Sequence, residues 1–351
     1  MALLRDRGLK GKELKGKEPR GKMIKKSSIP FPLIKLVERF RGRGFALSNR
    51  FPLYNPESDL SPFFIVGCGR SGNTLLRSML VANNQLVIPP ESYVIPRVVR
   101  KFIALGYLPW NELASIIISE FETFEEFHTW NVSLSPVYKK AKELEPEHQN
   151  LANVIDLIYK EYGLSVNKTN VRWGDKTPKN SEFLEHICST FPGAQYIHLI
   201  RDPRAVFASY KKADLKTRTD MKDKKNIVNF WLDCHRHIQH CKKTQGDGAF
   251  TVVHYEDLIQ SPELNLKTVS NFLGISYSHE MISRSNTTEL GDVRNDNHHA
   301  NVLNPISPSS ISKWKHELTA EEIDYVEKHC MKYYKKLCAM YPPNTTIDLL
   351  T

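Results

Sequence analysis

Short apolar runs alternate with longer stretches of helical spacing along most of this chain. Five of these runs predict buried strands, because short apolar runs bounded by polar turns are typical of strands covered on both faces. They lie near residues 63–66, 86–88, 170–173, 195–200 and 249–254. The stretches between them repeat apolar residues every three or four positions and predict helices. The alternation predicts an α/β fold of three layers, with helices on both faces of a central parallel sheet.

The region from residue 98 to residue 162 breaks this alternation. It has no run that predicts a strand, and its aromatic residues have helix-compatible spacing: Phe102, Tyr107, Trp110, Phe121, Phe124, Phe127 and Trp130. We expect a helical insertion in which these rings form core. An insertion that follows Glu91 is also placed to wall the pocket of a substrate.

The first apolar run leads directly into a glycine-rich turn that is followed by a helix. The segment is Gly67-Cys68-Gly69-Arg70-Ser71-Gly72-Asn73-Thr74. Backbone N–H groups at such a turn have no partner within the helix, and the helix dipole adds about half a positive charge there. Phosphate or sulfate oxygens are held at such a turn without a metal ion. The chain is therefore predicted to bind a phosphorylated ligand.

Two nucleotide-binding patterns also match this turn in part. Gly67, Gly69 and Gly72 match the G-x-G-x-x-G pattern of dinucleotide-binding folds. Glu91 follows the second apolar run at the distance of a ribose-binding acid. The first and third glycines also bracket four residues as in a P-loop, with Thr74 at the position of the magnesium-binding hydroxyl. These patterns leave a P-loop nucleotide kinase or NTPase as an alternative function, with a similar P-loop-like sheet.

The charged position of the loop argues against a nucleotide triphosphatase. Asn73 occupies the place of the lysine that binds the β and γ phosphates. The positive charge lies inside the loop instead, at Arg70, whose forked guanidinium suits a tetrahedral anion that accepts two hydrogen bonds. This arrangement favours a phosphate-like group that reacts without magnesium.

The turn resembles the 5′-phosphosulfate loop of sulfotransferases that use 3′-phosphoadenosine 5′-phosphosulfate (PAPS). The similar form is R-S-G-T-T-L-L, found in the bacterial and Golgi-type branch, which is distantly similar to tyrosylprotein sulfotransferases. The resemblance implies donor contacts from Gly69, Arg70, Ser71, Gly72, Asn73 and Thr74. Asn73 replaces the first threonine of that form, and we expect it to rearrange the donor contacts without loss of the site.

A second motif follows the strand predicted near 195–200. It is Arg201-Asp202-Pro203-Arg204, and a helical run comes after it. It resembles the 3′-phosphate motif of the same family, which implies that Arg201 and Ser209 bind the 3′-phosphate of the donor. The alternative is a strand followed by an ordinary surface helix with proline at its start.

Later segments extend the resemblance. Gly174-Asp175-Lys176-Thr177-Pro178 is similar to the family's G-D-K-T-P segment, which implies that Lys176 contacts the sulfuryl or bridging oxygens. The alternative for Lys176 is a solvated lysine before a helix. The resemblance also implies that Tyr255 lies near the adenosine and that Lys313, in Ser312-Lys313-Trp314, reaches the 3′-phosphate.

The general base is implied by Pro89-Pro90-Glu91-Ser92, which follows the second predicted strand at the carboxyl edge of the sheet. This segment resembles the P-P-E-S of bacterial members, and tyrosylprotein sulfotransferases use a glutamate here as base, so Glu91 is the expected base. Tyr93 stands where those enzymes have an arginine that contacts an acidic peptide, which argues against that substrate. Two alternatives stay open. Glu91 could only cap the following helix, or the base could be a histidine: His254, His298 or His299.

The resemblance thus implies a PAPS-dependent sulfotransferase that transfers a sulfuryl group by in-line displacement. The expected acceptor is a hydroxyl of a small molecule, lipid or glycan, such as a sterol or a phenol. Glu91 is expected to take the proton while Arg70 and Lys176 neutralise charge on the sulfuryl group. PAPS is the expected donor, and no metal ion is expected.

Charge adds a domain layout. The 351 residues carry a formal net charge of +10, with basic residues crowded near the start. A Gly/Lys tract buries too little apolar surface to order itself, so residues 1–30 are expected to form a disordered tail and not a nucleic-acid arm. Residues 31–61 are expected to be a linker whose helix packs on the domain or touches a membrane surface. The sulfotransferase domain is expected at 62–340, before a tail at 341–351.

Cysteines and hydropathy predict the compartment. The six cysteines lack metal-binding spacing and are expected to be reduced thiols. No signal peptide is evident, and no apolar run approaches the roughly 18 residues that span a bilayer. We therefore expect a cytoplasmic protein.

Overall fold

The computed structural model describes residues 50–213, 219–284 and 305–344. The predicted basic tail, the first part of the predicted linker, the end of the predicted C-terminal tail, and His298 and His299 lie outside the described residues. None of the helices in the described ranges is long and apolar enough to cross a membrane.

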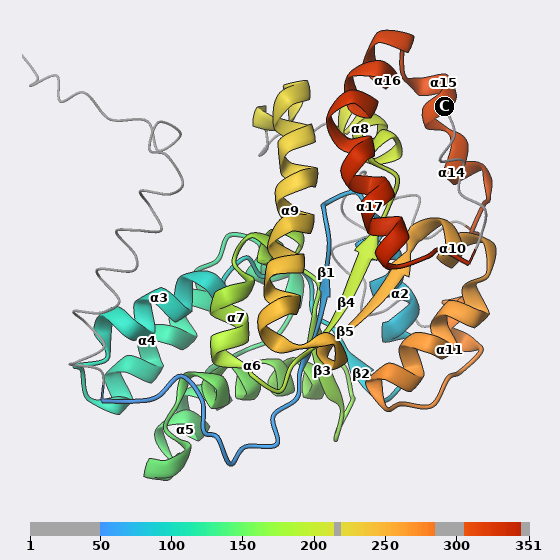
Figure 1. Cartoon of the computed structure of the whole chain (residues 1–351). Helices are drawn as coiled ribbons and strands as arrows, with labels where there is room; N and C mark the ends of the chain where they lie inside the picture. Colours follow the sequence, from blue (N-terminus) through green and yellow to red (C-terminus); the bar gives the residue numbers. More distant parts are fainter. Residues whose placement is uncertain (1–49, 214–218, 285–304, 345–351) are drawn as a thin grey trace, which may run out of the picture. The chain divides into compact units, whose positions relative to one another are not determined.

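The five predicted strands are present and form one sheet (Figure 1). They are β1 (Phe63–Val66), β2 (Leu86–Val87), β3 (Arg172–Asp175), β4 (Gln195–Ile200) and β5 (Phe250–His254), in the order β2-β3-β1-β4-β5. All neighbouring strands are parallel, and Phe63 lies opposite both Gly174 and Gln195. The third strand extends to Asp175, so that it leads directly to Lys176. The predicted α/β fold with a central parallel sheet is confirmed.

Helices connect the strands and follow the last one. Before β3 they are α2 (Asn73–Val81), α3 (Ile95–Leu105), α4 (Trp110–Glu122), α5 (Ser135–Lys142) and α6 (Leu151–Ser165). After β3 they are α7 (Leu184–Thr190), α8 (Pro203–Lys212), α9 (Lys224–Gln245), α10 (Tyr255–Gln260), α11 (Pro262–Leu273) and α12 (Glu280–Ser283). The last are α14 (Ser309–Ser312), α15 (Trp314–Glu317), α16 (Ala320–Val326) and α17 (Lys332–Met340), with a π-helical turn at Glu327–Met331.

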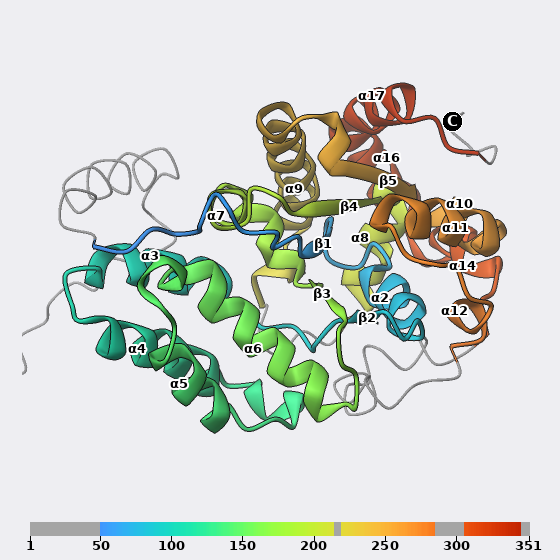
Figure 2. The same cartoon turned by 90° about the horizontal axis from the view of Figure 1, so that it is seen from below.

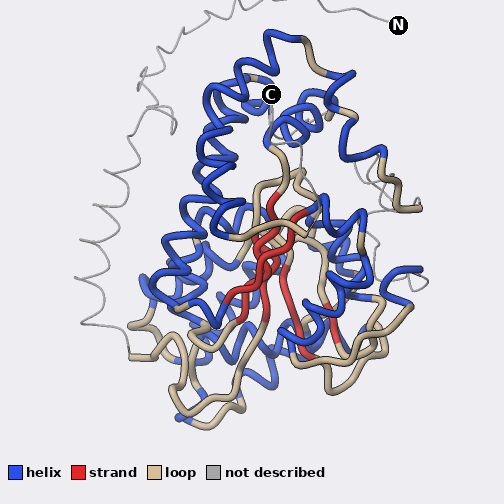
Figure 3. Tube along the Cα trace, turned by 45° about the vertical axis from the view of Figure 1, so that its right-hand side comes forward, coloured by secondary structure: helices blue, strands red, loops and turns tan. Residues whose placement is uncertain are grey.

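Alternate residues of β1 point into opposite cores, as expected of a strand covered on both faces. Phe64 and Val66 pack with residues of α3 to α7 and of α9. Phe63 and Ile65 pack with residues of α2, α11 and α12. Figure 2 shows α6 and α2 on opposite sides of the strands, and Figure 3 shows the strands enclosed between helices.

The predicted helical insertion lies between β2 and β3, where α3 to α6 gather on one side of the sheet (Figure 2). The ring centroid of Trp130 is 6.2 Å from that of Phe121 and 5.3 Å from that of Tyr159. Tyr159 in turn stacks on Trp173 of β3, with the centroids 4.2 Å apart. Most of the aromatic residues therefore form core, as predicted, and they attach the insertion to the sheet. Tyr107 is an exception, because it is exposed.

A third group of helices, α8, α9 and α15 to α17, packs beyond the carboxyl end of β4. Arg204 at the start of α8 holds this group together. Its guanidinium lies 4.0 Å from the ring centroid of Trp314, and it forms ion pairs with Asp202 at 2.8 Å and Glu327 at 2.7 Å. A buried charge is tolerated when it is paired and hydrogen-bonded in this way.

Gly174→Ala is expected to destabilise the fold. A Cβ atom at Gly174 would lie 2.4 Å from the ring of Phe63 on the adjacent strand. That ring is fully buried, so the core must shift to admit a methyl group. Overpacking of this kind costs about 1 to 3 kcal/mol. Chemical denaturation should show a lower midpoint with an unchanged slope.

Gly248→Ala is the matched control, because no atom lies within 4 Å of a Cβ atom added there. Its midpoint should stay close to that of the wild type. If the two variants unfold at the same denaturant concentration, the close approach of Phe63 does not prevent a side chain larger than that of glycine at position 174.

Candidate active site

The predicted site residues gather where the parallel strands end. The glycine turn follows β1, Glu91 follows β2, and Lys176 follows β3. Arg201 follows β4, and Tyr255 follows β5. In open parallel sheets the carboxyl ends of the strands meet at one edge, which is where ligands bind. The fold therefore explains why segments far apart in sequence meet.

Close packing shapes the glycine turn. A Cβ atom on Gly67 would lie 2.6 Å from the carbonyl oxygen of Leu199. Gly72 has a φ of +96°, and a Cβ atom there would lie 2.4 Å from the ring of Tyr255. Glycine is needed at both places for the close approach, and at Gly72 also for the left-handed backbone.

The start of α2 is open to an anion. Its N-cap residue Gly72 offers no side-chain cap, and no acidic residue lies in the first turn. Ser71 is fully buried, and its Oγ has no hydrogen-bond partner among the described residues. A buried hydroxyl at a helix start without a side-chain cap fits a bound phosphate or sulfate group.

Asn73 has a role that the sequence did not predict. Its Nδ2 donates a hydrogen bond to the carbonyl oxygen of Cys68 at 2.9 Å. The asparagine therefore closes the turn from inside. The expectation that Asn73 rearranges the contacts with the donor stays a prediction, and this bond shows how its amide group is used in the turn.

Lys176, Glu91 and Thr74 form the centre of the site. Lys176 is completely buried, and its Nζ donates a hydrogen bond to Thr74 Oγ1 at 3.1 Å. The same Nζ forms an ion pair with Glu91 Oε1. The Glu91 side chain is 16% exposed, so it is not fully closed off from the surface. The structure thus brings the predicted base and the predicted sulfuryl-binding lysine into contact.

Residues that sequence reasoning missed hold this centre in place. Thr177 Oγ1 accepts a hydrogen bond from the backbone N–H of Ser92 at 3.2 Å, which ties the lysine segment to the glutamate segment. The buried Arg77 of α2 donates from Nε to the carbonyl oxygen of Ile88 at 3.1 Å. Ser181 Oγ accepts from the N–H of Gly67 at 3.0 Å. The sequence does contain one signal for Arg77, because an arginine on the apolar face of a helix indicates a buried side chain that needs a hydrogen-bond partner.

Asp175, beside the lysine, is also buried and paired. It accepts hydrogen bonds from the hydroxyl of Tyr159 and from Asn180 Nδ2, each at 2.7 Å. Burial raises the pKa of Asp175, and the hydrogen bond from Tyr159 opposes that rise. This pair fixes the end of β3, and hence the starting point of the lysine side chain.

The two predicted 3′-phosphate residues lie next to the glycine turn. Arg201 Nη1 donates to the carbonyl oxygen of Arg70 at 2.9 Å. Arg70 Nε donates to Ser209 Oγ at 3.0 Å. The guanidinium of Arg201 also lies 4.0 Å from the ring centroid of Tyr255. Four residues predicted to bind the donor are therefore in mutual contact.

Ser310 of α14 completes this group and was not predicted. Its carbonyl oxygen accepts from Arg201 Nη2 at 3.2 Å, and its Oγ accepts from the hydroxyl of Tyr255 at 3.0 Å. Lys313 lies three residues further on and is exposed. The side chain of Lys313 has no hydrogen bond or ion pair within the described part of the chain, so its role stays a prediction.

The structure disfavours His254 as the base. His254 is buried, its Nε2 is bonded to the carbonyl oxygen of Tyr341 at 2.8 Å, and burial lowers the pKa of the ring.

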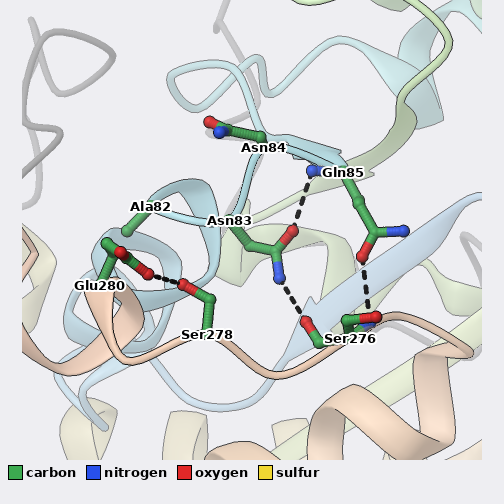
Figure 4. Close-up of a pocket in the computed structure, with 7 residues that line it drawn as sticks. All are labelled: Ala82, Asn83, Asn84, Gln85, Ser276, Ser278 and Glu280. Atoms are coloured by element: carbon green, nitrogen blue, oxygen red, sulfur yellow. Dashed lines mark hydrogen bonds between the residues drawn. The ribbon is translucent and has the colours of Figure 1, made fainter.

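A surface pocket of about 470 Å³ lies at the opposite end of β2, away from Glu91 (Figure 4). It is lined by Ala82, Asn83, Asn84, Gln85, Ser276, Ser278 and Glu280. Two of its amide groups are already paired, because Asn83 Nδ2 donates to the Ser276 carbonyl at 2.7 Å and Gln85 Oε1 accepts from the Ser276 N–H at 3.0 Å. It contains none of the predicted site residues.

Comparison with known proteins identifies the family. Residues 62–279 match a family model described as "Sulfotransferase family". Because the match covers more than half of the chain, the chain belongs to the sulfotransferase family. The predicted family is confirmed, and the alternative of a P-loop kinase is not favoured.

Relatives and a solved structure agree with this assignment. Protein-tyrosine sulfotransferase A of Caenorhabditis elegans is 25% identical over 267 residues, which cover 72% of this chain and 61% of that protein. Omega-hydroxy-beta-dihydromenaquinone-9 sulfotransferase of Mycobacterium tuberculosis is 24% identical over 251 residues, covering 61% of this chain and 63% of that protein. The chain thus spans less than two thirds of the length of either relative.

The fold is shared with the sulfotransferase domain of the Synechococcus PCC 7002 olefin synthase. The TM-score is 0.50 and the identity 23%, over 78% of this chain and 97% of that domain. This likeness supports the arrangement of sheet and helices described above.

Glu256, the second residue of α10, lies beside Asp202, which follows Arg201 in the sequence. It is buried, and its Oε1 accepts a hydrogen bond from the N–H of Asp202 at 3.1 Å. Its Oε2 has no hydrogen-bond partner among the described residues. Burial, with a smaller contribution from the negative charge of Asp202, raises the pKa of Glu256 to about 7.

This raised pKa makes stability depend on pH. Between the ordinary value of 4.5 and about 7, the folded protein binds a proton that the unfolded chain has lost, so stability falls as the pH rises through this window. Glu256→Gln keeps an acceptor for the Asp202 N–H and carries no charge. It should be more stable than the wild type at pH 8, by on the order of 2 kcal/mol, and much closer to it at pH 4.5. Thermal unfolding at both pH values measures this, and a pH-independent difference would contradict it.

Proposed function

We propose that this protein transfers a sulfuryl group from PAPS to the hydroxyl of an uncharged small-molecule, lipid or glycan acceptor. The contact between Lys176 and Glu91, at the start of α2 beside the glycine turn, carries this proposal. It combines an anion site, a buried cation and a partly exposed carboxylate within one edge of the sheet. These are the groups that sulfuryl transfer to an alcohol requires.

The residues around the glycine turn fit the donor. The start of α2, which has no side-chain cap, and the hydroxyl of Ser71, which has no partner among the described residues, suit the 5′-phosphosulfate. Arg201 and Ser209, which both contact Arg70 of the glycine turn, suit the 3′-phosphate. A guanidinium and a hydroxyl both make charge-assisted hydrogen bonds with a phosphate group. Tyr255 packs against Gly72 and under the guanidinium of Arg201, so its ring joins the two proposed phosphate-binding regions and suits a place near the adenosine.

The proposed step is an in-line displacement. A lone pair of the acceptor oxygen attacks sulfur, the bond between sulfur and the bridging oxygen breaks, and the acceptor proton passes to Glu91. Negative charge then develops on the bridging oxygen and on the phosphate of the leaving nucleotide. Lys176 and Arg70 oppose that charge, and the dry surroundings of Lys176 strengthen its effect.

The acceptor is proposed to be uncharged because the basic residues of α3 are already occupied. Arg97 Nε forms an ion pair with Glu120 at 2.7 Å, and Lys101 pairs with the same carboxylate. Arg100 lies over the ring of Phe183 at 5.7 Å from its centroid. An acidic peptide would have to compete with Glu120 for Arg97 and Lys101, so these side chains would contribute less to its binding. One relative is named for protein tyrosine and the other for a menaquinone alcohol, and the common chemistry is a hydroxyl.

Arg201→Ala should remove the preference for a 3′-phosphate. Calorimetry on the wild type should show adenosine 3′,5′-bisphosphate binding far more tightly than adenosine 5′-phosphate. The variant should lose about 10- to 100-fold in affinity for the bisphosphate and little for the monophosphate, because one charge-assisted contact is worth about 1.5 to 3 kcal/mol.

Arg236→Ala is the control for this experiment, because Arg236 is an exposed arginine paired only with Asp233 in the described ion pairs. It should bind both nucleotides as the wild type does. Equal affinity of the wild type for the two nucleotides would contradict PAPS as the donor.

Glu91→Gln should abolish base catalysis. Glutamine keeps the shape and a hydrogen-bonding group but cannot accept the proton, so turnover of an alkyl alcohol should fall by roughly 100- to 10,000-fold. The loss should be smaller for an acidic phenol, which ionises with less help. Binding of the bisphosphate should not change. Near-normal turnover of the alkyl alcohol would instead assign the base to a histidine such as His298 or His299.

A further inference from the structure

Tyr93 follows the proposed base by two residues and has an unusual conformation. Its φ is +50°, in the left-handed region that bulky residues rarely adopt. It is 39% exposed, whereas its neighbours Ser92 and Val94 are buried. Its hydroxyl donates a hydrogen bond to Glu91 Oε2. An exposed, strained residue in contact with a catalytic group is typical of a functional position.

The two carboxylate oxygens of Glu91 have different partners. Oε1 is turned toward the buried ammonium group of Lys176, and Oε2 toward the hydroxyl of Tyr93. An acceptor hydroxyl must come within hydrogen-bond distance of the base before its proton can move. The side of the carboxylate that faces the protein interior is closed by Lys176, so the acceptor must approach on the side of Tyr93.

The ring of Tyr93 has an aromatic neighbour from the helical insertion. Its centroid lies 5.9 Å from that of Phe124, just after α4, and the two planes are inclined by 45°. Phe124 itself packs against the core of the insertion. The two rings therefore make a fixed apolar surface beside an otherwise polar carboxylate.

We propose that Tyr93 determines which acceptors react. In the free enzyme its hydroxyl occupies the place on Glu91 that the acceptor hydroxyl takes during the reaction. When the acceptor displaces that hydroxyl, the rings of Tyr93 and Phe124 form one wall of the acceptor site, against which a flat, uncharged body lies. This inference rests on the function proposed above.

Tyr93→Phe and Tyr93→Ala separate the two roles, because phenylalanine removes only the competing hydroxyl and alanine also removes the wall. The probe is 2-naphthalenemethanol, an alkyl hydroxyl on a flat apolar body. Its affinity for the enzyme–bisphosphate complex is measured by calorimetry, which needs no turnover. Tyr93→Phe should bind it about 3- to 10-fold more tightly, and Tyr93→Ala about 10-fold more weakly, than the wild type.

Kinetics with PAPS give a second measurement. For Tyr93→Phe the KM of the alcohol should fall while kcat stays within about threefold of the wild type, as expected when only a competing ground-state contact is removed. Tyr107→Phe and Tyr107→Ala are matched controls, because Tyr107 is an exposed tyrosine elsewhere in the insertion. They should leave both the affinity and the KM unchanged.

Unchanged or weaker binding by Tyr93→Phe would show that the hydroxyl does not compete with the acceptor. Failure of the wild-type complex to bind 2-naphthalenemethanol would contradict the aromatic wall. Both results leave the proposed function standing if the wild type sulfates a different alcohol. If the wild type transfers no sulfuryl group to any alcohol, the proposed function is contradicted. If the two variants still change the binding of the alcohol in opposite directions, the proposed displacement of the Tyr93 hydroxyl by the alcohol stands.

Discussion

The site is organised around one buried cation, the ammonium group of Lys176. It has no access to water, so its partners must come from the protein. Removing one member of a buried ion pair typically costs about 3 to 5 kcal/mol. Glu91 and Thr74 are those partners, and they come from the segment after β2 and the first turn of α2. One nitrogen atom thus ties together three segments that leave three different strands, and the position of the carboxylate is required by the fold as well as by the chemistry.

The same ion pair is rearranged in the proposed reaction. Before the donor binds, the positive charge of Lys176 stabilises the Glu91 carboxylate. Sulfuryl and bridging oxygens that approach the lysine compete for that charge, and Glu91 is left with less stabilisation. Lys176 therefore contacts the proposed base and is also the proposed partner of the group to be transferred, so one ion pair positions both sides of the proposed reaction.

The strands and the residues at their ends could be predicted from the sequence because both depend on local patterns. A short apolar run predicts a buried strand, and parallel strands bring their carboxyl ends together, so residues that follow different strands, such as Glu91 and Lys176, meet at one edge. The roles expected of the two residues depend on the family resemblance. Contacts such as Gly67 with Ser181 or Arg201 with Ser310 join residues more than 100 positions apart. No local pattern encodes such pairings.

Residues of a motif also make contacts within the protein that the motif does not specify. Asn73 occupies a position of the donor motif, yet its amide closes the turn on Cys68. The motif specifies which residue types surround the ligand. Only the three-dimensional structure shows which of their hydrogen bonds are made within the loop and are therefore not made to the ligand. The contact between Arg201 and the carbonyl of Arg70 shows the same principle. Arg70 has a left-handed backbone, with φ of +66°. Arg201 and Ser209, which are proposed to bind the 3′-phosphate, both contact Arg70 of the proposed 5′-phosphosulfate loop, so in the proposed complex the two ends of the donor are recognised by neighbouring residues.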